Sequence, residues 1–348
     1  MTDTTVPQPR ETSGPRLLSV VVPAYNEEEV LEEFERRTRG ALTSLDQAYE
    51  LVFVNDGSSD GTLTLLLRLR RANPNITVVN LSRNFGKEIA LTAGLDQALG
   101  DVVVVIDADL QDPPELMGEM IEEWRDGYDV VYAQRLSREG ESWFKKSSAA
   151  IFYALMQKVG PVRIPADTGD FRLMSRRVVD AVSELREHHR FMKGLFAWVG
   201  FAQKSIQYHR DARFGGDSKW SYWRLWKLSL EGITSFTTFP LQLATYIGLI
   251  AAVASFVFGL LIVAKTLIFG EAVQGFPLMM TTIVLLGGIQ LIALGMIGEY
   301  LGRVFNETKN RPLYIIERVE PSAGAQQFAV ESQDYKRPTQ PQTGHLSI

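Results

Sequence analysis

The first third of the chain alternates short apolar runs with longer segments of mixed polarity. The apolar runs occupy residues 18–22, 50–54, 76–79 and 101–106. Between the last two runs, residues 88–99 place Ile89, Ala90 and Ala93 at helical spacing. Strands that alternate with helices favour a parallel sheet with right-handed crossovers. The pattern therefore predicts an α/β domain whose strands are covered on both faces.

Each apolar run ends in a polar turn. The turns read PAYNEE at 23–28, NDGSSDG at 55–61, NLSRNFGK at 80–87 and DADLQDPPE at 107–115. The carboxyl ends of parallel strands lie at one edge of the sheet, and open α/β folds bind their ligands at that edge. Four such turns on one edge predict a nucleotide pocket.

Asp107 and Asp109 are the candidate metal ligands of this edge, because they directly follow the fourth apolar run. Like charges this close repel one another unless a cation lies between them. A hard divalent ion, Mg²⁺ or Mn²⁺, that holds a diphosphate suits two carboxylates. The alternative is a solvated turn in which Asp112 caps the next helix, with Pro113 at the first helical position and Glu115 completing a capping box. We interpret Asp107 and Asp109 as chemical and Asp112 as structural.

Two long uncharged segments, residues 241–264 and 276–298, lie in the last third of the chain. The first, about 24 residues, makes roughly 36 Å of helix, which is enough to cross a bilayer core. The connection is short, so we assign residues 240–303 to a transmembrane hairpin; a buried pair of soluble helices is the alternative. Basic residues flank the hairpin more than they occupy its connection, which by the positive-inside rule places the catalytic domain and both termini in the cytoplasm.

The other segments complete the predicted organisation. Residues 1–16 are polar and lack the apolar core of a secretory signal, so we expect a flexible leader. Residues 17–218 form the catalytic domain. Residues 219–239 carry Trp and Tyr among basic residues and predict amphipathic helices on the membrane surface, with packing against the catalytic domain as the alternative. Residues 304–348 form a cytoplasmic segment that we expect to be disordered after about residue 320.

The amino-acid composition limits the kinds of ligand and partner that we expect the chain to bind. The 348-residue chain has no cysteine, which excludes disulfides and thiolate metal sites. Its net charge of −5 gives no reason to expect nucleic acid as a partner. Helices on the membrane surface would hold the predicted site at the height of a lipid phosphate. Arginine is suited to bind that phosphate, because its guanidinium makes bidentate contacts with phosphate oxygens. Candidate cations are Arg135, Arg213 and Lys219; for a single Arg, a solvated surface charge is the alternative.

Five motifs in order resemble those of a known family. The four turns named above are followed by DTGDFRL at 167–173. Together they resemble the inverting glycosyltransferases of family 2, and more closely the polyprenyl-phosphate glycosyltransferases, from Leu18 to about Arg303. The chain lacks the QxxRW motif of the processive synthases in that superfamily. The resemblance implies a GT-A, Rossmann-like nucleotide-sugar domain with a mostly parallel sheet, followed by interfacial helices and a two-helix transmembrane hairpin.

The resemblance also implies residue roles. Those implied for the nucleotide sugar are Pro23, Tyr25, Glu27, Asp56, Lys87 and Asp107. Those implied for the metal and diphosphate are Asp107, Asp109 and Gln111. Those implied for catalysis are Asp167, Asp170 and Arg135. Those implied for the acceptor phosphate are Arg135, Arg213, Ser218 and Lys219. One of Asp167 and Asp170 is the base or orients the acceptor, and for Asp170 a loop-capping role is the alternative.

The predicted function is the transfer of one sugar, with inversion, from a nucleotide diphosphate sugar to a polyprenyl phosphate. The acceptor phosphate is already anionic, so it needs charge neutralisation and alignment more than a base. UDP-glucose is the favoured donor; GDP-mannose and UDP-N-acetylhexosamine are alternatives. A glycan or protein hydroxyl acceptor, which would need a base, and a non-catalytic membrane scaffold are the competing functions. The resemblance implies a bacterial plasma-membrane enzyme that forms a homo-oligomer, a tetramer in the family.

Overall fold

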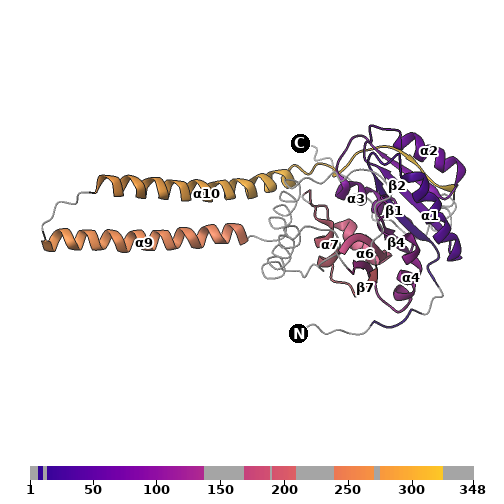
Figure 1. Ribbon diagram of the computed structural model, residues 1–348, viewed down its shortest axis with the longest axis horizontal. Coiled ribbons are helices and arrows are strands. Elements are labelled where there is room, and N and C mark those ends of the chain that lie inside the picture. The colour runs from indigo at the N-terminus through magenta and orange to yellow at the C-terminus, as the bar shows by residue number, and fades with distance from the viewer. Residues whose placement is uncertain are drawn as a thin grey trace, which may run out of the picture.

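The computed structural model describes residues 7–10, 14–136, 168–188, 190–208, 239–269 and 275–323. These residues form an α/β domain and two long helices that run side by side away from it (Figure 1). The α/β class predicted from the alternating pattern is confirmed.

The described residues form an eight-stranded sheet in the order β7-β5-β6-β4-β1-β2-β3-β8. The strands are β1 (Leu18–Ala24), β2 (Tyr49–Asn55), β3 (Ile76–Leu81), β4 (Val102–Val105), β5 (Val130–Arg135), β6 (Thr168–Ser175), β7 (Gln203–Tyr208) and β8 (Ile316–Glu320). β1, β2, β3 and β4 are parallel, as are β5 and β7, whereas β6 and β8 run antiparallel to their neighbours. The sheet is mostly parallel, as predicted.

β1 lies between β4 and β2, so the chain order reverses there. The turns that follow β1 and β4 meet at the carboxyl ends of these neighbouring strands, where open α/β folds bind their ligands, and we call this edge of the sheet the crevice. Asp107 follows β4 and Tyr25 follows β1, which brings the predicted metal and nucleotide residues to this crevice.

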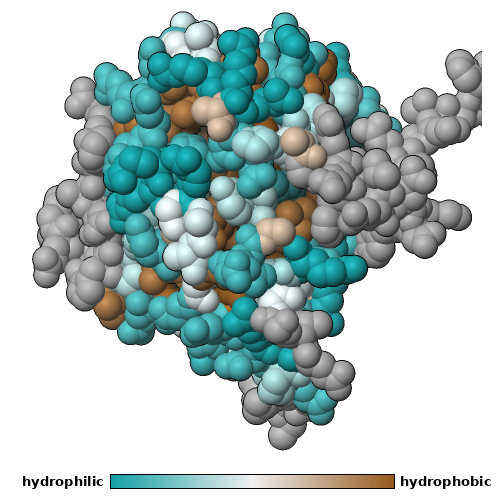
Figure 2. Space-filling model, turned by 90° about the vertical axis from the view of Figure 1, so that its right-hand side faces the viewer, coloured by the Kyte–Doolittle hydropathy of each residue, from teal (hydrophilic) through white to brown (hydrophobic). Residues whose placement is uncertain are grey.

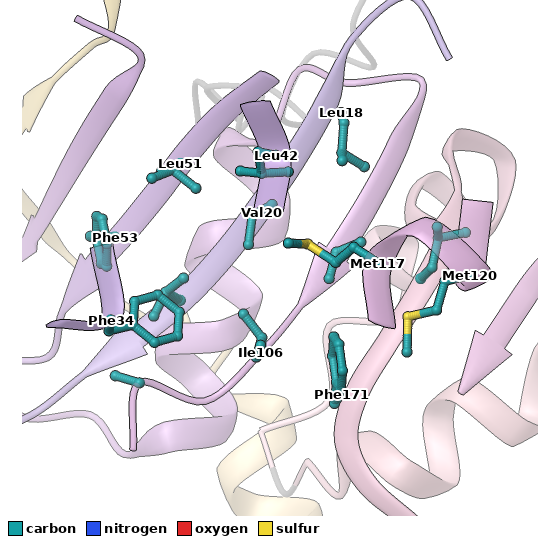
Figure 3. Packing of buried hydrophobic residues seen from close by; sticks show 14 of the residues in the cluster. Leu18, Val20, Phe34, Leu42, Leu51, Phe53, Ile106, Met117, Met120 and Phe171 are labelled. Atoms are coloured by element: carbon teal, nitrogen blue, oxygen red, sulfur yellow. The ribbon is translucent and has the colours of Figure 1, made fainter. Parts of the chain in front are cut away.

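Helices cover both faces of the sheet. One face packs against α1 (Leu31–Ser44), α2 (Thr62–Ala72) and α4 (Met117–Arg125). The other packs against α3 (Lys87–Gln97), α6 (Arg176–Glu184) and α7 (Met192–Trp198). Neighbouring valines of β1 divide between the two cores, Val20 in the first and Val21 in the second, because successive strand residues point to opposite faces. Figure 3 shows the first core, where Phe34 and Phe53 meet edge to face.

Helix α3 lies unusually close to the sheet. A side chain at Gly94 would have its Cβ 2.3 Å from Val21 Cγ1 and 3.0 Å from Val54 Cγ2, so only glycine permits this approach. The close packing fixes the first residues of α3, Lys87 and Glu88, beside the ends of the central strands.

The two long helices are α9 (Phe239–Phe269) and α10 (Phe276–Thr308), and both are long and apolar enough to cross a membrane. Their apolar side chains are exposed; Phe256 is 73 % and Leu267 81 % exposed. The predicted alternative, a buried helix pair, therefore does not describe them. The end of the molecule opposite these helices is mainly hydrophilic (Figure 2). α10 continues past residue 298, where the Glu299–Arg303 pair at i,i+4 spacing supports the added turns.

Two segments near the chain ends make contacts that the sequence analysis did not predict. Arg10, in the leader predicted to be flexible, donates to the Tyr128 carbonyl at 2.9 Å and binds Asp129 at 2.8 Å. The chain after α10, predicted as a cytoplasmic segment that is disordered after about residue 320, returns to the sheet as β8. A five-residue strand with three charged residues gives too little periodicity to be recognised. The interfacial helices predicted at 219–239 lie almost wholly outside the described residues.

Candidate functional site

Lys87 joins two carboxylates at the centre of the crevice. Its Nζ lies 2.7 Å from Asp107 Oδ1 and 2.8 Å from Asp107 Oδ2, and it also donates to Asp170 Oδ2. Asp107 follows β4, Asp170 lies on β6, and Lys87 begins α3. Burial opposes the ammonium charge, but the two carboxylates outweigh it and raise the pKa of Lys87. The resemblance assigned Lys87 to the nucleotide sugar; the structure places it between the predicted metal and catalytic carboxylates.

Asp170 is held as an anion by three cations. Burial alone would raise its pKa, but Lys87, Lys193 and Arg172 outweigh burial and hold the pKa of Asp170 well below its usual range. Asp170 Oδ1 is buried and has no hydrogen-bond partner in the described part of the chain. Among the described residues, Asp170 Oδ1 therefore makes no loop-capping hydrogen bond. An ionised carboxylate oxygen of this kind can accept a hydrogen bond from a hydroxyl group of a ligand.

Residues that the sequence analysis did not single out surround Asp170. Lys193 Nζ on α7 donates to the Thr168 carbonyl at 2.9 Å, and Arg172 Nη2 donates to the Gly169 carbonyl at 3.1 Å. Glu88 Oε2 accepts the Met192 N–H at 3.2 Å. Burial and the charge of Asp170 raise the pKa of Glu88 to about 7.

Glu88 and Arg172 could have been noticed, because Glu88 directly follows the NLSRNFGK motif and Arg172 lies within DTGDFRL. Lys193 could not, because nothing local in the sequence shows that α7 packs beside the start of β6.

Asp109 and Gln111 share a tight turn after β4. The Gln111 N–H donates to Asp109 Oδ1 at 3.2 Å, and Leu110 between them adopts a φ of 57° with its side chain buried. Within the described residues, no three His, Asp or Glu side chains gather closely enough to hold a metal ion by themselves. The pair Asp107 and Asp109 supplies hard oxygen ligands, and a cation, the Lys87 ammonium, already lies on Asp107. These residues fit a divalent ion that completes its ligand set with diphosphate oxygens.

Asp56 fixes the turn before α3. Its Oδ1 accepts the Phe85 N–H at 2.7 Å and its Oδ2 accepts the Gly86 N–H at 2.9 Å. Asp56 is 2 % exposed, and burial raises its pKa more than these two bonds lower it. The residue therefore organises the loop around a predicted nucleotide site. Tyr25, by contrast, directly follows β1 and is 40 % exposed.

Pro23 and Glu27 are the other two residues near this turn that the resemblance assigned to the nucleotide sugar. Pro23 lies within β1 and is paired with Val54, and the Glu27 N–H donates to Thr62 Oγ1 at 3.0 Å. The Glu27 carbonyl accepts the Val30 N–H at the entry to α1. Both residues lie at or just after the carboxyl end of β1, the edge of the sheet predicted for the nucleotide.

Arg135 reaches the same crevice from the end of β5. Its Nε donates to the Tyr208 hydroxyl at 3.3 Å, and Tyr208 in turn donates to Asp112 Oδ1. A Cβ at Gly169 would lie 3.2 Å from Arg135 Nη2, which places the guanidinium beside Gly169, near the start of β6. Burial opposes its charge, but Tyr208 and Asp112 outweigh burial and raise the pKa of Arg135.

The predicted capping box at Asp112 is wrong. Asp112 is 1 % exposed and is bound to Tyr208, while the short helix at Pro114–Leu116 has no side-chain cap. Glu115 instead forms a two-point ion pair with Arg37 of α1. The buried tyrosine hydroxyl on β7, distant in sequence, binds the carboxylate that the local pattern assigned to a helix end. Asp167, Arg213, Ser218 and Lys219, the other predicted site residues, lie outside the described residues.

Comparison with known proteins finds one matching family model and several similar proteins. Residues 19–183 match the model of "Glycosyl transferase family 2". An uncharacterized glycosyltransferase of Synechocystis sp. is 52 % identical over 86 % of this chain and 94 % of its own length. The bactoprenol glucosyl transferase of Shigella phage SfII is 46 % identical over 86 % of this chain and 97 % of its own length. Glucosyl-3-phosphoglycerate synthase from Mycobacterium tuberculosis, solved with Mn²⁺ and UDP, is 23 % identical over 62 % of this chain and 76 % of its own, with a TM-score of 0.42.

Proposed function

The chain belongs to glycosyl transferase family 2, and on that premise we propose that it transfers one sugar from a nucleotide diphosphate sugar, UDP-glucose, to a polyprenyl phosphate at the cytoplasmic face of a bacterial plasma membrane. The family resemblance predicted from five motifs is confirmed. The relative named a bactoprenol glucosyl transferase supports both the lipid acceptor and the glucosyl donor.

The observation that carries the proposal is the charge arrangement around Asp170. Three cations keep this carboxylate ionised, so it is a weak proton acceptor. A glycan or protein hydroxyl would need a base to remove its proton, whereas a phosphate oxygen is already anionic. Asp170 is therefore poorly suited to be that base and suits an acceptor that arrives deprotonated, such as a lipid phosphate.

Each residue then has a role in alignment and charge neutralisation. Asp170 Oδ1, buried and without a partner among the described residues, would accept a hydroxyl of the transferred sugar. Lys87 and Arg135 would offset the negative charge of the two phosphate groups brought together at the reacting carbon. Attack by the lipid phosphate from the face opposite the leaving diphosphate would invert the anomeric configuration.

Asp107 and Asp109, with Gln111 fixing their turn, would hold Mg²⁺ or Mn²⁺. Such an ion supplies Lewis-acid stabilisation of the departing nucleoside diphosphate. Tyr25, Glu27 and Asp56 would then bound the nucleoside part of the crevice.

The two apolar helices would anchor this site at the membrane. We propose that α9 and α10 cross the bilayer as a hairpin, with the catalytic domain and both termini on the cytoplasmic side. Arg213, Ser218 and Lys219 would then lie between the domain and the first span and bind the acceptor phosphate. A homo-oligomer, tetrameric as in the family, is the expected assembly.

Turnover measured with a matrix of substrates tests the function. Purified protein in lipid nanodiscs is given UDP-glucose, UDP-N-acetylglucosamine or GDP-mannose, each with and without undecaprenyl phosphate and Mg²⁺. We expect nucleoside diphosphate release that requires the lipid and is fastest with UDP-glucose. Release that requires a glycan or protein acceptor instead would favour the hydroxyl alternative, and a chain that releases nothing under any condition would be a scaffold.

A further inference from the structure

The segment after α10 returns to the catalytic domain, and its strand β8 begins beside the carboxyl end of β3, at the edge of the sheet assigned to the nucleotide. Figure 1 shows it crossing the domain to the sheet. The Ser82 N–H donates to the Ile315 carbonyl at 3.0 Å, and β8 then pairs antiparallel with β3. Beyond β8, Arg70 Nη2 donates to the Pro321 carbonyl at 2.8 Å. Chain that follows the predicted hairpin is thus part of the catalytic sheet.

Strand β8 carries a bulge at Glu317. Asn80 is paired with Arg318 and Leu81 with Ile316, so Glu317 is the extra residue between two ladder pairs. A bulge changes the direction of a side chain relative to a regular strand. Here the Glu317 carboxylate accepts a hydrogen bond from Asn80 Nδ2 at 2.7 Å.

Further hydrogen bonds continue from Asn80 into the crevice. Asn80 Oδ1 accepts from Asn55 Nδ2 at 2.6 Å, and Asn55 is 2 % exposed. Asn55 Oδ1 accepts the Ser58 N–H at 3.4 Å, and Ser58 Oγ accepts the Asn26 N–H at 3.0 Å. This relay, Glu317–Asn80–Asn55–Ser58–Asn26, joins the turns that follow β1 and β2.

We propose that Glu317 is a positioning residue for nucleotide binding, because it sets the relay that orients the turns carrying Tyr25 and Asp56. A carboxylate only accepts hydrogen bonds, so Glu317 selects the orientation of the Asn80 amide with its NH₂ outward and its oxygen toward Asn55. That orientation in turn leaves Asn55 Oδ1 for the Ser58 N–H. The inference rests on the proposed function, since it assumes that these turns bind a nucleotide.

Binding of UDP with Mg²⁺ to the full-length protein, measured by calorimetry, tests the relay. Glu317→Ala removes the acceptor and should raise the Kd for UDP about three- to tenfold, the effect of about one hydrogen bond. Glu317→Gln keeps an acceptor oxygen and should stay within about twofold of the wild type. Asn80→Asp places a second carboxylate opposite Glu317 and should lower the affinity for UDP. Adding Glu317→Gln to this variant supplies an N–H donor to the new carboxylate and should restore part of the affinity.

The neighbouring Arg318→Ala on β8 is the matched control, and its UDP affinity should equal that of the wild type. An unchanged Kd in both Glu317→Ala and Asn80→Asp, or a double variant no tighter than Asn80→Asp alone, would overturn the relay. Hydrogen exchange of the Ser58 amide separates this failure from that of the proposed function, because it needs no nucleotide. The relay predicts faster exchange in Glu317→Ala, and equal exchange would overturn it; a wild type that binds neither UDP nor GDP would instead contradict the function.

Discussion

Replacing Glu88 by glutamine should make the protein more stable at high pH and leave it nearly unchanged at low pH. Burial and the negative charge of Asp170 raise the pKa of Glu88 to about 7 from an ordinary value of 4.5. Below the ordinary value the carboxyl is protonated in both the folded and unfolded states. Between the two values the unfolded state loses its proton and the folded state keeps it, so the free energy of unfolding falls as pH rises.

The magnitude follows from the two pKa values. A difference from 4.5 to about 7 corresponds to about 3 kcal/mol at about 1.4 kcal/mol per pH unit, fully lost above pH 7. Partial solvent access lowers this, so we expect about 1–3 kcal/mol. Glutamine is uncharged at every pH, and its amide oxygen can still accept the Met192 N–H. For a domain of this size 1 kcal/mol corresponds to about 2–4 °C, so Glu88→Gln should melt about 2–12 °C above the wild type at pH 8.

Thermal unfolding in detergent between pH 5 and pH 8 measures this difference. The melting temperatures of Glu88→Gln and the wild type should agree within about 2 °C at pH 5 and separate as pH rises. Glu119→Gln, at an exposed position of α4, is the matched control and should show no pH-dependent gain. A Glu88→Gln gain that stays constant with pH would refute the electrostatic argument, because other titrating groups are common to both proteins.

Three further predictions concern the metal, the acceptor and the topology. Asp109→Asn should lower sugar transfer at least about 100-fold and weaken Mn²⁺-dependent UDP binding, with the melting temperature unchanged, because the residue lies at the sheet edge and outside the core; normal turnover of this variant in the presence of chelator would contradict a metal site. Arg213→Ala and Lys219→Ala should raise the KM for polyprenyl phosphate about tenfold while changing the KM for the nucleotide sugar less than about twofold; a larger effect on the donor would place this loop on the diphosphate. A reporter inserted between α9 and α10 should label from outside the cell and reporters at both termini from inside, and the reverse pattern would overturn the orientation.

The sequence predicted the parts of the fold that short-range patterns encode. The four apolar runs became β1 to β4, and the rule that ligands lie at the carboxyl ends of parallel strands placed Asp107 and Asp56 at one crevice. The uncharged segments form α9 and α10. Both helices extend beyond the uncharged stretches, because a charged residue does not by itself end a helix. These features depend on neighbours along the chain, which the sequence displays directly.

The contacts that define the crevice depend on residues far apart in sequence and could not be predicted. Asp112 looked like a helix cap, but Tyr208 of β7 binds it in the interior. Lys193 of α7 and Glu88 of α3 meet Asp170 only after both helices pack on one face of the sheet. Strand β8 is short and charged, and its place at the sheet edge comes from pairing with β3. No local pattern records which distant partner a polar side chain will find.

Detection of the lipid product tests the central claim most directly. Full-length protein in nanodiscs is incubated with UDP-glucose, undecaprenyl phosphate and Mg²⁺, and the lipid extract is measured by mass spectrometry. We predict an ion with the mass of undecaprenyl phosphate plus one hexose, formed by the wild type and abolished in Asp109→Asn. Free glucose and UDP without any hexosyl lipid, or a hexose found only on protein or glycan, would contradict the account.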